Sequence, residues 1–340
     1  MQNLQDKSAA NGTQEITSAA PAWECEDIAI VGIGLALPGA MNPEQFWDIL
    51  ITGPQLFEPA PDDRWCSENF YSASPAAEDK SYSPYNGFVK ELGTSAGDTG
   101  AAEPCVDASV RWLRHALAHA MRGVKRNDAD HLTFVVGYTP DGNPCLEQSY
   151  VARGYTHRLR EILEQLDGDN QESRALAGLI EQRLQARYRG GAMSPADFLP
   201  EVSGRKAMHD LLPENTELLM VDTACSSSLH AVDIGIKGLL TGKSEIAVCG
   251  GAFAVGPLQG VLFSKLGALA HGATVRSLDK DSDGVLFADA ASVVVLKRLQ
   301  RARRDGDRIF GVIKAFGSSS DGRGKAIYCL LYTSPSPRDS

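Results

Sequence analysis

The chain has 340 residues, of which 43% are hydrophobic, and a formal net charge of −10. This length and apolar content suit one large α/β domain or two small ones. The negative charge disfavours a nucleic acid or an anionic membrane as the main partner. Seven cysteines, an odd number without the pairing typical of metal sites, indicate a reducing compartment and predict a cytoplasmic protein.

The N-terminal residues and one uncharged stretch give evidence on localisation. Residues 1–25 are polar and aperiodic, which predicts a flexible leader, and Met1–Ala20 lacks the apolar core of a signal peptide. Residues 246–263 are uncharged and long enough to suggest a membrane span, but four glycines and a proline interrupt them. We predict a short buried strand there, Ile246–Val248, followed by a glycine turn.

Periodicity predicts the other elements in chain order. Strands are expected at Ile28–Val31 and Leu132–Val136. Between them, Asn42-Pro43 is suited to begin a helix, and a second helix follows. The apolar positions of these two helices are Phe46, Trp47, Ile49 and Leu50, and then Val106, Val110, Leu113, Leu117 and Met121.

The most informative segment is Val221–Leu240, near the start of which stands Cys225. The apolar run Leu218–Val221 predicts a buried strand, and apolar residues after the cysteine recur at helical spacing. Cys225 is therefore expected at a sharp turn from strand to helix, beside unpaired N–H groups at the positive end of the helix dipole. That environment favours the nucleophilic thiolate, and Ser226–Ser228 suit the first helical turn. We predict that Cys225 is a catalytic nucleophile rather than a buried structural cysteine.

Four segments carry a resemblance to one family. DTACSSSL, at Asp222–Leu229, resembles the nucleophile motif of the β-ketoacyl synthase (ketosynthase) domains of type I polyketide and fatty-acid synthases. Glu26–Leu50 is similar to the opening strand and first helix of those domains, and Pro61–Trp65 to the short motif that follows. Ser277–Leu299 resembles their segment after the nucleophile. In order and spacing, the resemblance extends over residues 26–328.

This resemblance implies an α/β fold, a thiolase-like αβαβα sandwich of two similar halves. In this family two histidines of the second half assist the cysteine, one in a His-Gly-Thr-Gly-Thr motif and one in an Asn-x-Gly-His motif, and neither motif occurs here. We therefore expect residues 26–328 to hold an essentially complete N-terminal half, with the C-terminal half mostly missing. Residues 329–340 do not continue the resemblance and are interpreted as a non-native or disordered tail.

The implied reaction is decarboxylative Claisen condensation in polyketide or fatty-acid biosynthesis. An acyl group passes from the phosphopantetheine thiol of an acyl carrier protein to Cys225, whose backbone N–H forms part of an oxyanion hole. The enolate of a malonyl-type extender then attacks this thioester, a step that needs further hydrogen-bond donors. The resemblance implies no bound cofactor or metal, a homodimer when the domain is complete, and other synthase modules as neighbours. We expect the fragment itself to be inactive, with apolar faces exposed.

Residues 145–190 depart from the family pattern. They contain two amphipathic stretches separated by Gly168-Asp169-Asn170, which predicts a helical insertion. We hypothesise that it caps the acyl pocket or lies at a dimer edge. Its apolar positions are Tyr155, Leu159, Ile162 and Leu166, and then Leu176, Ile180 and Leu184.

The histidines match no site of the family. His271 stands in a His-Gly-Ala-Thr sequence but precedes Ser277–Leu299, whereas the family's histidines follow that segment. His230 lies on the predicted helix of Cys225, in a poor position to reach its sulfur. We expect structural roles for these and for the others, which are His115, His119, His131, His157 and His209.

Three further motifs are also interpreted as structural. Asp279–Gly284 copies the first half of an EF-hand loop, but Ala290 stands where the bidentate Glu is required. Gly32-Ile33-Gly34 follows a strand, as in dinucleotide-binding motifs, but Leu37 replaces the third glycine. A basic cluster is expected to be a solvated helix face, with docking of an acidic carrier protein as the second interpretation. Its residues are Lys297, Arg298, Arg301, Arg303 and Arg304.

Three alternatives to a ketosynthase remain open. A hydrolase with a Cys–His pair would release its acyl group to water. A chain-length-factor-like protein would resemble a ketosynthase but lack the nucleophile, whereas Cys225 is present. The third alternative is calcium binding through the turn at Asp279–Gly284.

Overall fold

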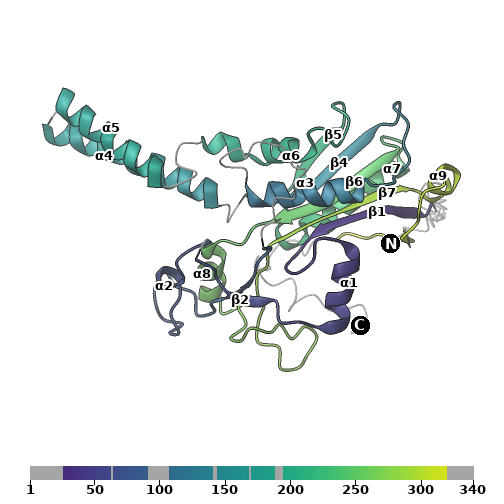
Figure 1. Ribbon diagram of the computed structural model, residues 1–340, viewed down its shortest axis with the longest axis horizontal. Coiled ribbons are helices and arrows are strands. Elements are labelled where there is room, and N and C mark those ends of the chain that lie inside the picture. The colour runs from purple at the N-terminus through teal and green to yellow at the C-terminus, as the bar shows by residue number, and fades with distance from the viewer. Residues whose placement is uncertain are drawn as a thin grey trace, which may run out of the picture.

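The computed structural model describes residues 26–62, 64–90, 107–140, 144–167, 170–187 and 194–319. The predicted leader and tail lie outside these ranges. A six-stranded sheet in the order β5-β4-β6-β7-β1-β8 forms the centre of the molecule (Figure 1). Its strands are β1 (Ile28–Ala36), β4 (Leu132–Tyr138), β5 (Glu217–Val221), β6 (Ile246–Phe253), β7 (Ala290–Arg298) and β8 (Gly311–Ile313).

The sheet has a parallel half and an antiparallel half. β4 runs parallel to both β5 and β6, whereas β7 pairs antiparallel with β6 and β1, and β8 pairs antiparallel with β1. β4 is buried along its whole length because strands lie on both sides of it and helices cover both faces. β5, which the apolar run predicted to be buried, is only half-buried because it is an edge strand.

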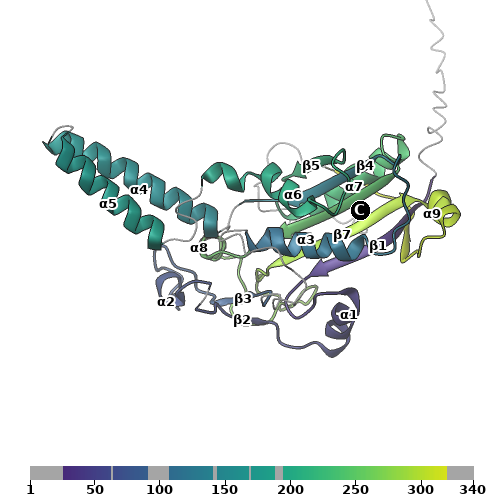
Figure 2. The same cartoon turned by 45° about the horizontal axis from the view of Figure 1, so that its top comes forward.

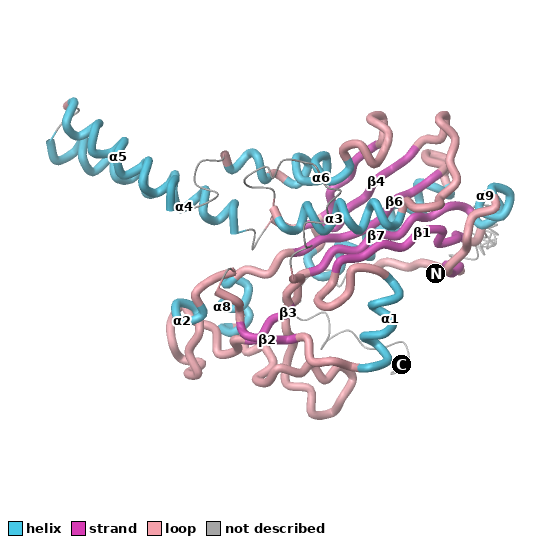
Figure 3. Tube along the Cα trace, viewed as in Figure 1, coloured by secondary structure: helices cyan, strands magenta, loops and turns pink. Residues whose placement is uncertain are grey.

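Helices cover the two faces of the sheet, so that the described residues form an α/β/α arrangement (Figure 3). α3 (Ala108–Ala120) and α6 (Pro200–Met208) pack on one face, and α7 (Ser227–Leu240) packs on the other. A Cβ on Gly32 or Gly34 would come within 2.0 Å of a backbone oxygen of α3. These glycines therefore permit close packing of helix on strand, and they lie inside β1 rather than in a phosphate-binding loop.

The remaining short elements lie around this core, several of them below the sheet as drawn in Figure 1. α1 begins as predicted, with the Asn42 side chain accepting the Gln45 N–H at 2.9 Å. These elements are α1 (Pro43–Thr52), β2 (Phe57–Pro59), α2 (Ser67–Phe70), β3 (Tyr85–Gly87), η2 (Pro195–Phe198), η3 (Ala224–Ser226), α8 (Pro257–Lys265) and α9 (Leu299–Asp305).

The glycine turn predicted after Val248 is wrong, because β6 continues to Phe253. A Cβ on Gly250 would lie 2.4 Å from the Ser292 carbonyl oxygen, and one on Gly251 would lie 3.0 Å from the Ser228 Cβ. Both glycines serve close approach within a strand rather than chain reversal. Nowhere in the described ranges does a helix combine the length and the apolar character that a membrane crossing needs.

The predicted helical pair is present as α4 (Pro144–Asp167) and α5 (Gln171–Arg187). The two helices pack against each other, and we call them together the hairpin. In both orientations the hairpin extends away from the sheet instead of folding over it (Figures 1 and 2).

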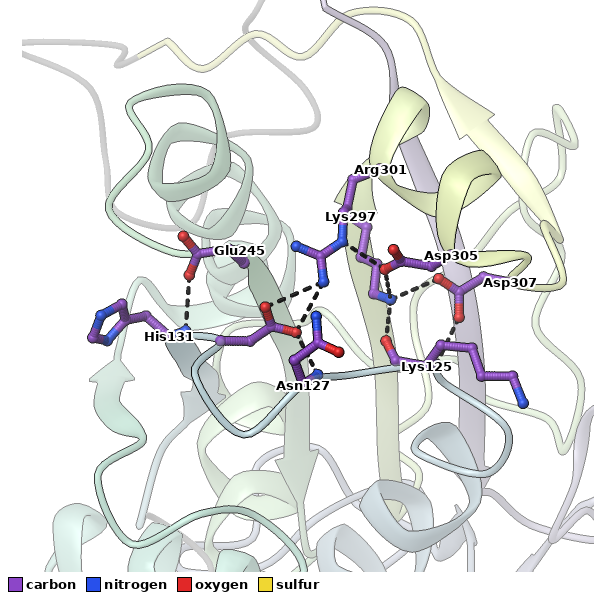
Figure 4. Close-up of polar contacts among 9 residues, drawn as sticks. Lys125, Asn127, His131, Glu245, Lys297, Arg301, Asp305 and Asp307 are labelled. Atoms are coloured by element: carbon purple, nitrogen blue, oxygen red, sulfur yellow. Dashed lines mark hydrogen bonds and ion pairs between the residues drawn. The ribbon is translucent and has the colours of Figure 1, made fainter.

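The basic cluster is not a uniformly solvated face (Figure 4). The side chain of Lys297 on β7 is fully buried, and its Nζ lies 2.6 Å from Asp307 and 3.0 Å from Asp305. Arg301 contacts Asp305 at 2.6 Å and Asp130 at 3.1 Å. The prediction failed because Asp130 and Asp307 come from turns outside the helix, which a helical pattern does not reveal, although Asp305 lies on α9 itself. The network ties β7 and α9 to the connection before β4.

Candidate functional site

Cys225 lies in the connection from β5 to α7, at the carboxyl ends of the parallel strands. β5 ends at Val221, the 3₁₀ turn η3 contains the cysteine, and α7 begins at Ser227. Ala224 has a φ of 53°, a left-handed conformation that is uncommon for a residue other than glycine. The chain therefore reverses sharply just before Cys225, and the cysteine is exposed.

Side chains of the turn itself hold its backbone. The Asp222 carboxylate accepts the Ala224 N–H at 3.0 Å. The Ser227 hydroxyl accepts the Thr223 N–H at 2.9 Å and donates to the Ala224 carbonyl at 2.6 Å. Ser226 donates to the Thr223 carbonyl at 2.9 Å, and it belongs to η3 rather than to the first turn of α7 as predicted. This local bonding stabilises the left-handed residue in front of the cysteine.

The amide N–H of Cys225 has no hydrogen-bond partner within the described part of the chain. An unengaged donor beside an exposed sulfur is one component of an oxyanion hole. Cys249, unlike Cys225, is buried, because it lies within β6, and burial raises the pKa of its thiol to about 12. Cys249 is therefore protonated near neutral pH and packs as an apolar side chain.

Two glycines form the floor beneath the start of α7. Gly137 of β4 and Gly251 of β6 are partners in the sheet. A Cβ on Gly137 would lie 2.6 Å from the backbone of Ser227 and Ser228. Because no larger residue fits, the first turn of α7 rests directly on the strand ends. The close contact at these two glycines, which we call the glycine floor, therefore fixes the distance between the strand ends and the turn that carries Cys225.

A buried polar cluster anchors the same end of β4 from the α3 face. The Tyr138 hydroxyl donates to the Asp107 carboxylate at 3.0 Å, and Asp107 also accepts the Ser109 N–H and so caps α3. Burial, and then the charge of Asp107, raises the pKa of Tyr138 to about 12. We did not predict this cluster, although an Asp just before a helical pattern is a recognisable N-cap signal.

Among the described residues, no histidine forms a hydrogen bond with Cys225. His271 stacks on Tyr82 with ring centroids 4.8 Å apart, and its backbone N–H donates to Asp283 at 3.2 Å. His230 lies on α7, half-buried. The other described histidines have partners of their own. The His115 ring bonds the Met41 carbonyl and lies against the His119 ring, and the His131 N–H donates to Glu245. His157 pairs with Glu161, and His209 pairs with Asp210.

The carboxylates of the turn at Asp279–Gly284 bind other groups of this chain. Arg276 contacts Asp283 at 3.1 Å, and this hydrogen bond, followed by the one from the His271 N–H, lowers the pKa of the Asp283 carboxyl. Asp279 accepts the Asp281 N–H at 2.8 Å. In the described ranges, no group of three His, Cys, Asp or Glu residues is placed to hold a metal ion.

One buried ion pair joins two of the segments that carry the family resemblance. Arg64, from Pro61–Trp65, contacts Asp289 at 2.8 Å. Asp289 also accepts the N–H groups of Val89 and Val255. Burial raises the pKa of Asp289, while Arg64 and the two amides favour its ionised form. The pair holds the chain before α2 against the chain before β7.

The chain matches a family model described as "Beta-ketoacyl synthase, N-terminal domain" over residues 25–182 and 217–302. A phenolphthiocerol/phthiocerol polyketide synthase from Mycobacterium tuberculosis is 29% identical over 305 residues, which cover 88% of this chain and 15% of the relative. Probable polyketide synthase 1 of Dictyostelium discoideum is 28% identical, covering 87% of this chain and 8% of the relative. The chain thus spans under a fifth of the length of these relatives.

Solved structures show the same fold. The oxazolomycin ketosynthase domain OzmH KS7 from Streptomyces albus matches with a TM-score of 0.62 and 24% identity, covering 85% of this chain and 46% of that one. A β-ketoacyl synthase from Burkholderia phymatum matches with a TM-score of 0.64 and 15% identity, covering 88% and 65%. The three-layer arrangement corresponds to half of the predicted sandwich. The match to the family model covers well over half of the chain, which therefore belongs to the β-ketoacyl synthase family.

Proposed function

We propose that Cys225 accepts an acyl chain from the phosphopantetheine thiol of an acyl carrier protein, as the first half of a ketosynthase reaction. One observation carries the proposal: an exposed cysteine follows a left-handed residue at a strand-to-helix turn, with its own amide free to bind an oxyanion. Polyketide or fatty-acid assembly is the corresponding pathway class, and membership of the family supports it.

In this transfer the Cys225 sulfur attacks the thioester carbonyl, and the oxygen becomes negatively charged at the position that the Cys225 amide can reach. The bond from the carbonyl carbon to the carrier sulfur then breaks, and the carrier thiolate takes up a proton. In the second half, a malonyl-type thioester loses carbon dioxide, and the resulting carbanion attacks the acyl carbon. The Cys225–carbon bond breaks, and the released chain is a β-ketoacyl thioester two carbons longer.

Transfer to the sulfur is tested with an acyl thioester of N-acetylcysteamine, a short analogue of the phosphopantetheine arm. Peptide mapping by mass spectrometry should place the acyl group on the peptide that contains Cys225. The Cys225→Ala variant should lose the adduct, and Cys249→Ala should keep it. Equal acylation of the Cys225→Ala variant would overturn the proposed nucleophile.

Condensation is a separate proposal. We infer that the chain of 340 residues acylates without condensing, because in the described ranges no histidine stands at Cys225 to stabilise the enolate. Addition of a malonyl thioester to the acylated chain should therefore give no β-ketoacyl product by mass spectrometry. Formation of that product at a rate dependent on Cys225 would contradict this inference and leave the assigned nucleophile intact.

The partners follow from the same proposal. The substrate donors are acyl carrier proteins, no metal or redox cofactor takes part, and a homodimer in the cytoplasm is the expected state of the complete enzyme. A hydrolase is the other enzymatic class with an activated cysteine. A hydrolase would lose the acyl group from Cys225 to water within the time of the assay, whereas a ketosynthase retains it until a carbanion arrives.

A further inference from the structure

The peptide unit that joins Ala224 to Cys225 carries the donor for the proposed oxyanion. Its N–H belongs to Cys225, and its C=O belongs to Ala224. The N–H and C=O of a trans peptide unit point to opposite sides of one rigid plane, and the described part of the chain contains no cis peptide bond. Any group that holds the Ala224 carbonyl therefore also sets the direction of the Cys225 N–H.

Ser227 binds this carbonyl through two donors. Its hydroxyl donates to the Ala224 oxygen at 2.6 Å, and its backbone N–H donates to the same oxygen at the end of η3. Both donors belong to the first residue of α7. The Ala224 carbonyl therefore points toward α7, and the Cys225 N–H points away from that helix, where no group of the described residues accepts it.

The Ser227 hydroxyl is itself held in place. Ser227 is buried, whereas Ala224 and Cys225 are exposed. A Cβ on Gly137 would lie 2.8 Å from the Ser227 Cβ, so that the glycine floor leaves little room for this side chain to move. The hydroxyl oxygen also accepts the Thr223 N–H at 2.9 Å. With that side of the oxygen engaged, its proton is directed at the Ala224 carbonyl.

The left-handed conformation of Ala224 makes this second anchor necessary. The conformation is unfavourable for alanine and persists only where the surroundings hold it. Asp222 binds the Ala224 N–H at 3.0 Å, which belongs to the peptide unit before this residue. Among the described side chains, Ser227 alone bonds the peptide unit after it, which is the unit that carries the oxyanion donor.

We propose that Ser227 is a positioning residue for acyl transfer, and that its hydroxyl aims the Cys225 N–H at the thioester oxygen. The inference rests on the proposed function of Cys225. When the sulfur adds to the carbonyl carbon, an electron pair of the C=O bond moves to the oxygen. The aimed N–H stabilises this charge until the pair returns and the bond to the carrier sulfur breaks. Without the hydroxyl, only the backbone N–H of Ser227 holds the peptide unit, and the donor turns away from the oxygen.

Two reactions of the same sulfur distinguish this role from a purely structural one. Acylation by an acyl thioester of N-acetylcysteamine creates an oxyanion, whereas iodoacetamide loses iodide from a saturated carbon and creates none. In the whole chain, Ser227→Ala should slow acylation of Cys225 at least about tenfold, because the oxyanion loses its aimed donor. Alkylation of Cys225 should stay within about twofold, because it depends on the exposed thiolate alone. Peptide mapping at successive times measures both rates.

Two further variants serve as controls. Ser228→Ala removes the next hydroxyl of α7, on an exposed residue, and should change neither rate. Ser227→Thr keeps a hydroxyl at the same position and should acylate at least about fivefold faster than Ser227→Ala. Alanine is the best helix former and suits the first turn of α7, so that Ser227→Ala should fold, which circular dichroism verifies.

Equal slowing of acylation and alkylation in Ser227→Ala would mean that the residue only supports the turn, and would overturn the inference. Unchanged acylation in that variant, or a threonine variant as slow as the alanine variant, would overturn it as well. Each of these results leaves Cys225 as the proposed nucleophile. An unsubstituted chain that is alkylated at Cys225 but never acylated there would instead overturn the proposed function, and this inference with it.

Discussion

At the scale of single residues, local structure distinguishes Cys225, in the turn between β5 and α7, from Cys249, in β6. Cys225 is exposed behind a left-handed alanine, whereas Cys249 is buried and burial raises its pKa to about 12. We expect iodoacetamide at pH 8 to alkylate Cys225 at least about tenfold faster than Cys249, because the thiolate is the reacting form. Time-resolved peptide mapping measures both rates in one sample. In urea the two rates should converge, and convergence without urea would contradict the assignment.

Tyr138 gives a prediction about alkaline pH. Its folded pKa of about 12 lies above the unfolded value near 10, so the neutral phenol stabilises the fold below pH 10 and this contribution is lost as pH rises toward 12. From pH 9 to 11, the free energy of unfolding should therefore fall by about 1 kcal/mol more in the unsubstituted chain than in Tyr138→Phe. Urea titrations at both pH values measure the difference. Tyr155→Phe, on an exposed tyrosine, controls for the loss of one phenol.

At the scale of elements, the contact between α7 and the strand ends depends on the glycine floor. Gly137→Ala would place a methyl group 2.6 Å from the backbone of α7, and overpacking of this kind costs roughly 1–3 kcal/mol. We expect lower stability to urea and slower alkylation of Cys225, since the turn must shift. Gly178→Ala on α5 meets no atom within 4 Å and should stabilise the chain by about 0.5–1 kcal/mol. Equal effects of the two substitutions would exclude a special role for the floor.

The buried lysine of β7 supports a second prediction about elements. Lys297→Met would leave Asp307, whose side chain is 1% exposed, without its cation, and loss of one partner of a buried pair costs roughly 3–5 kcal/mol. Lys243→Met, which breaks the exposed pair with Glu217, should cost at most about 1 kcal/mol. Chemical unfolding followed by circular dichroism compares them. Adding Asp307→Asn to Lys297→Met should recover part of the loss, and no recovery would argue against an electrostatic cause.

The features that depend on residues close together in the chain could be predicted from the sequence. The Asn42 cap, the strand-to-helix turn at Cys225 and the helices of the hairpin each depend on residues within a few positions of one another. The failures concern contacts between distant segments. Gly250 packs on β7, and Lys297 contacts Asp307 after α9 and the distant carbonyl of Lys125, so that neither environment is visible in a local pattern. The Tyr138–Asp107 bond joins residues 31 positions apart and was missed for the same reason.

At the scale of the whole molecule, α1 is a helix whose apolar side chains remain exposed. α1 has no buried residue, and Trp47 and Ile51 are 63% and 68% exposed. The exposed apolar face of α1 predicts aggregation of the isolated chain. Trp47→Lys/Ile51→Lys should reduce both the fluorescence of bound anilinonaphthalene sulfonate and the turbidity on warming. Asp48→Lys makes the same change in charge on the same helix and should leave both signals nearly unchanged.

The central position of β1 has a consequence for biosynthesis. In the part of the chain that the structure describes, β1 pairs only with β7 and β8, which begin at Ala290 and Gly311, so that more than 250 residues separate it from either neighbour. While a ribosome makes the intervening chain, the amides of this strand must stay hydrated or be shielded by a chaperone, and pairing across such a separation is slow. The turn that presents Cys225 can form on the parallel strands before β1 joins the sheet.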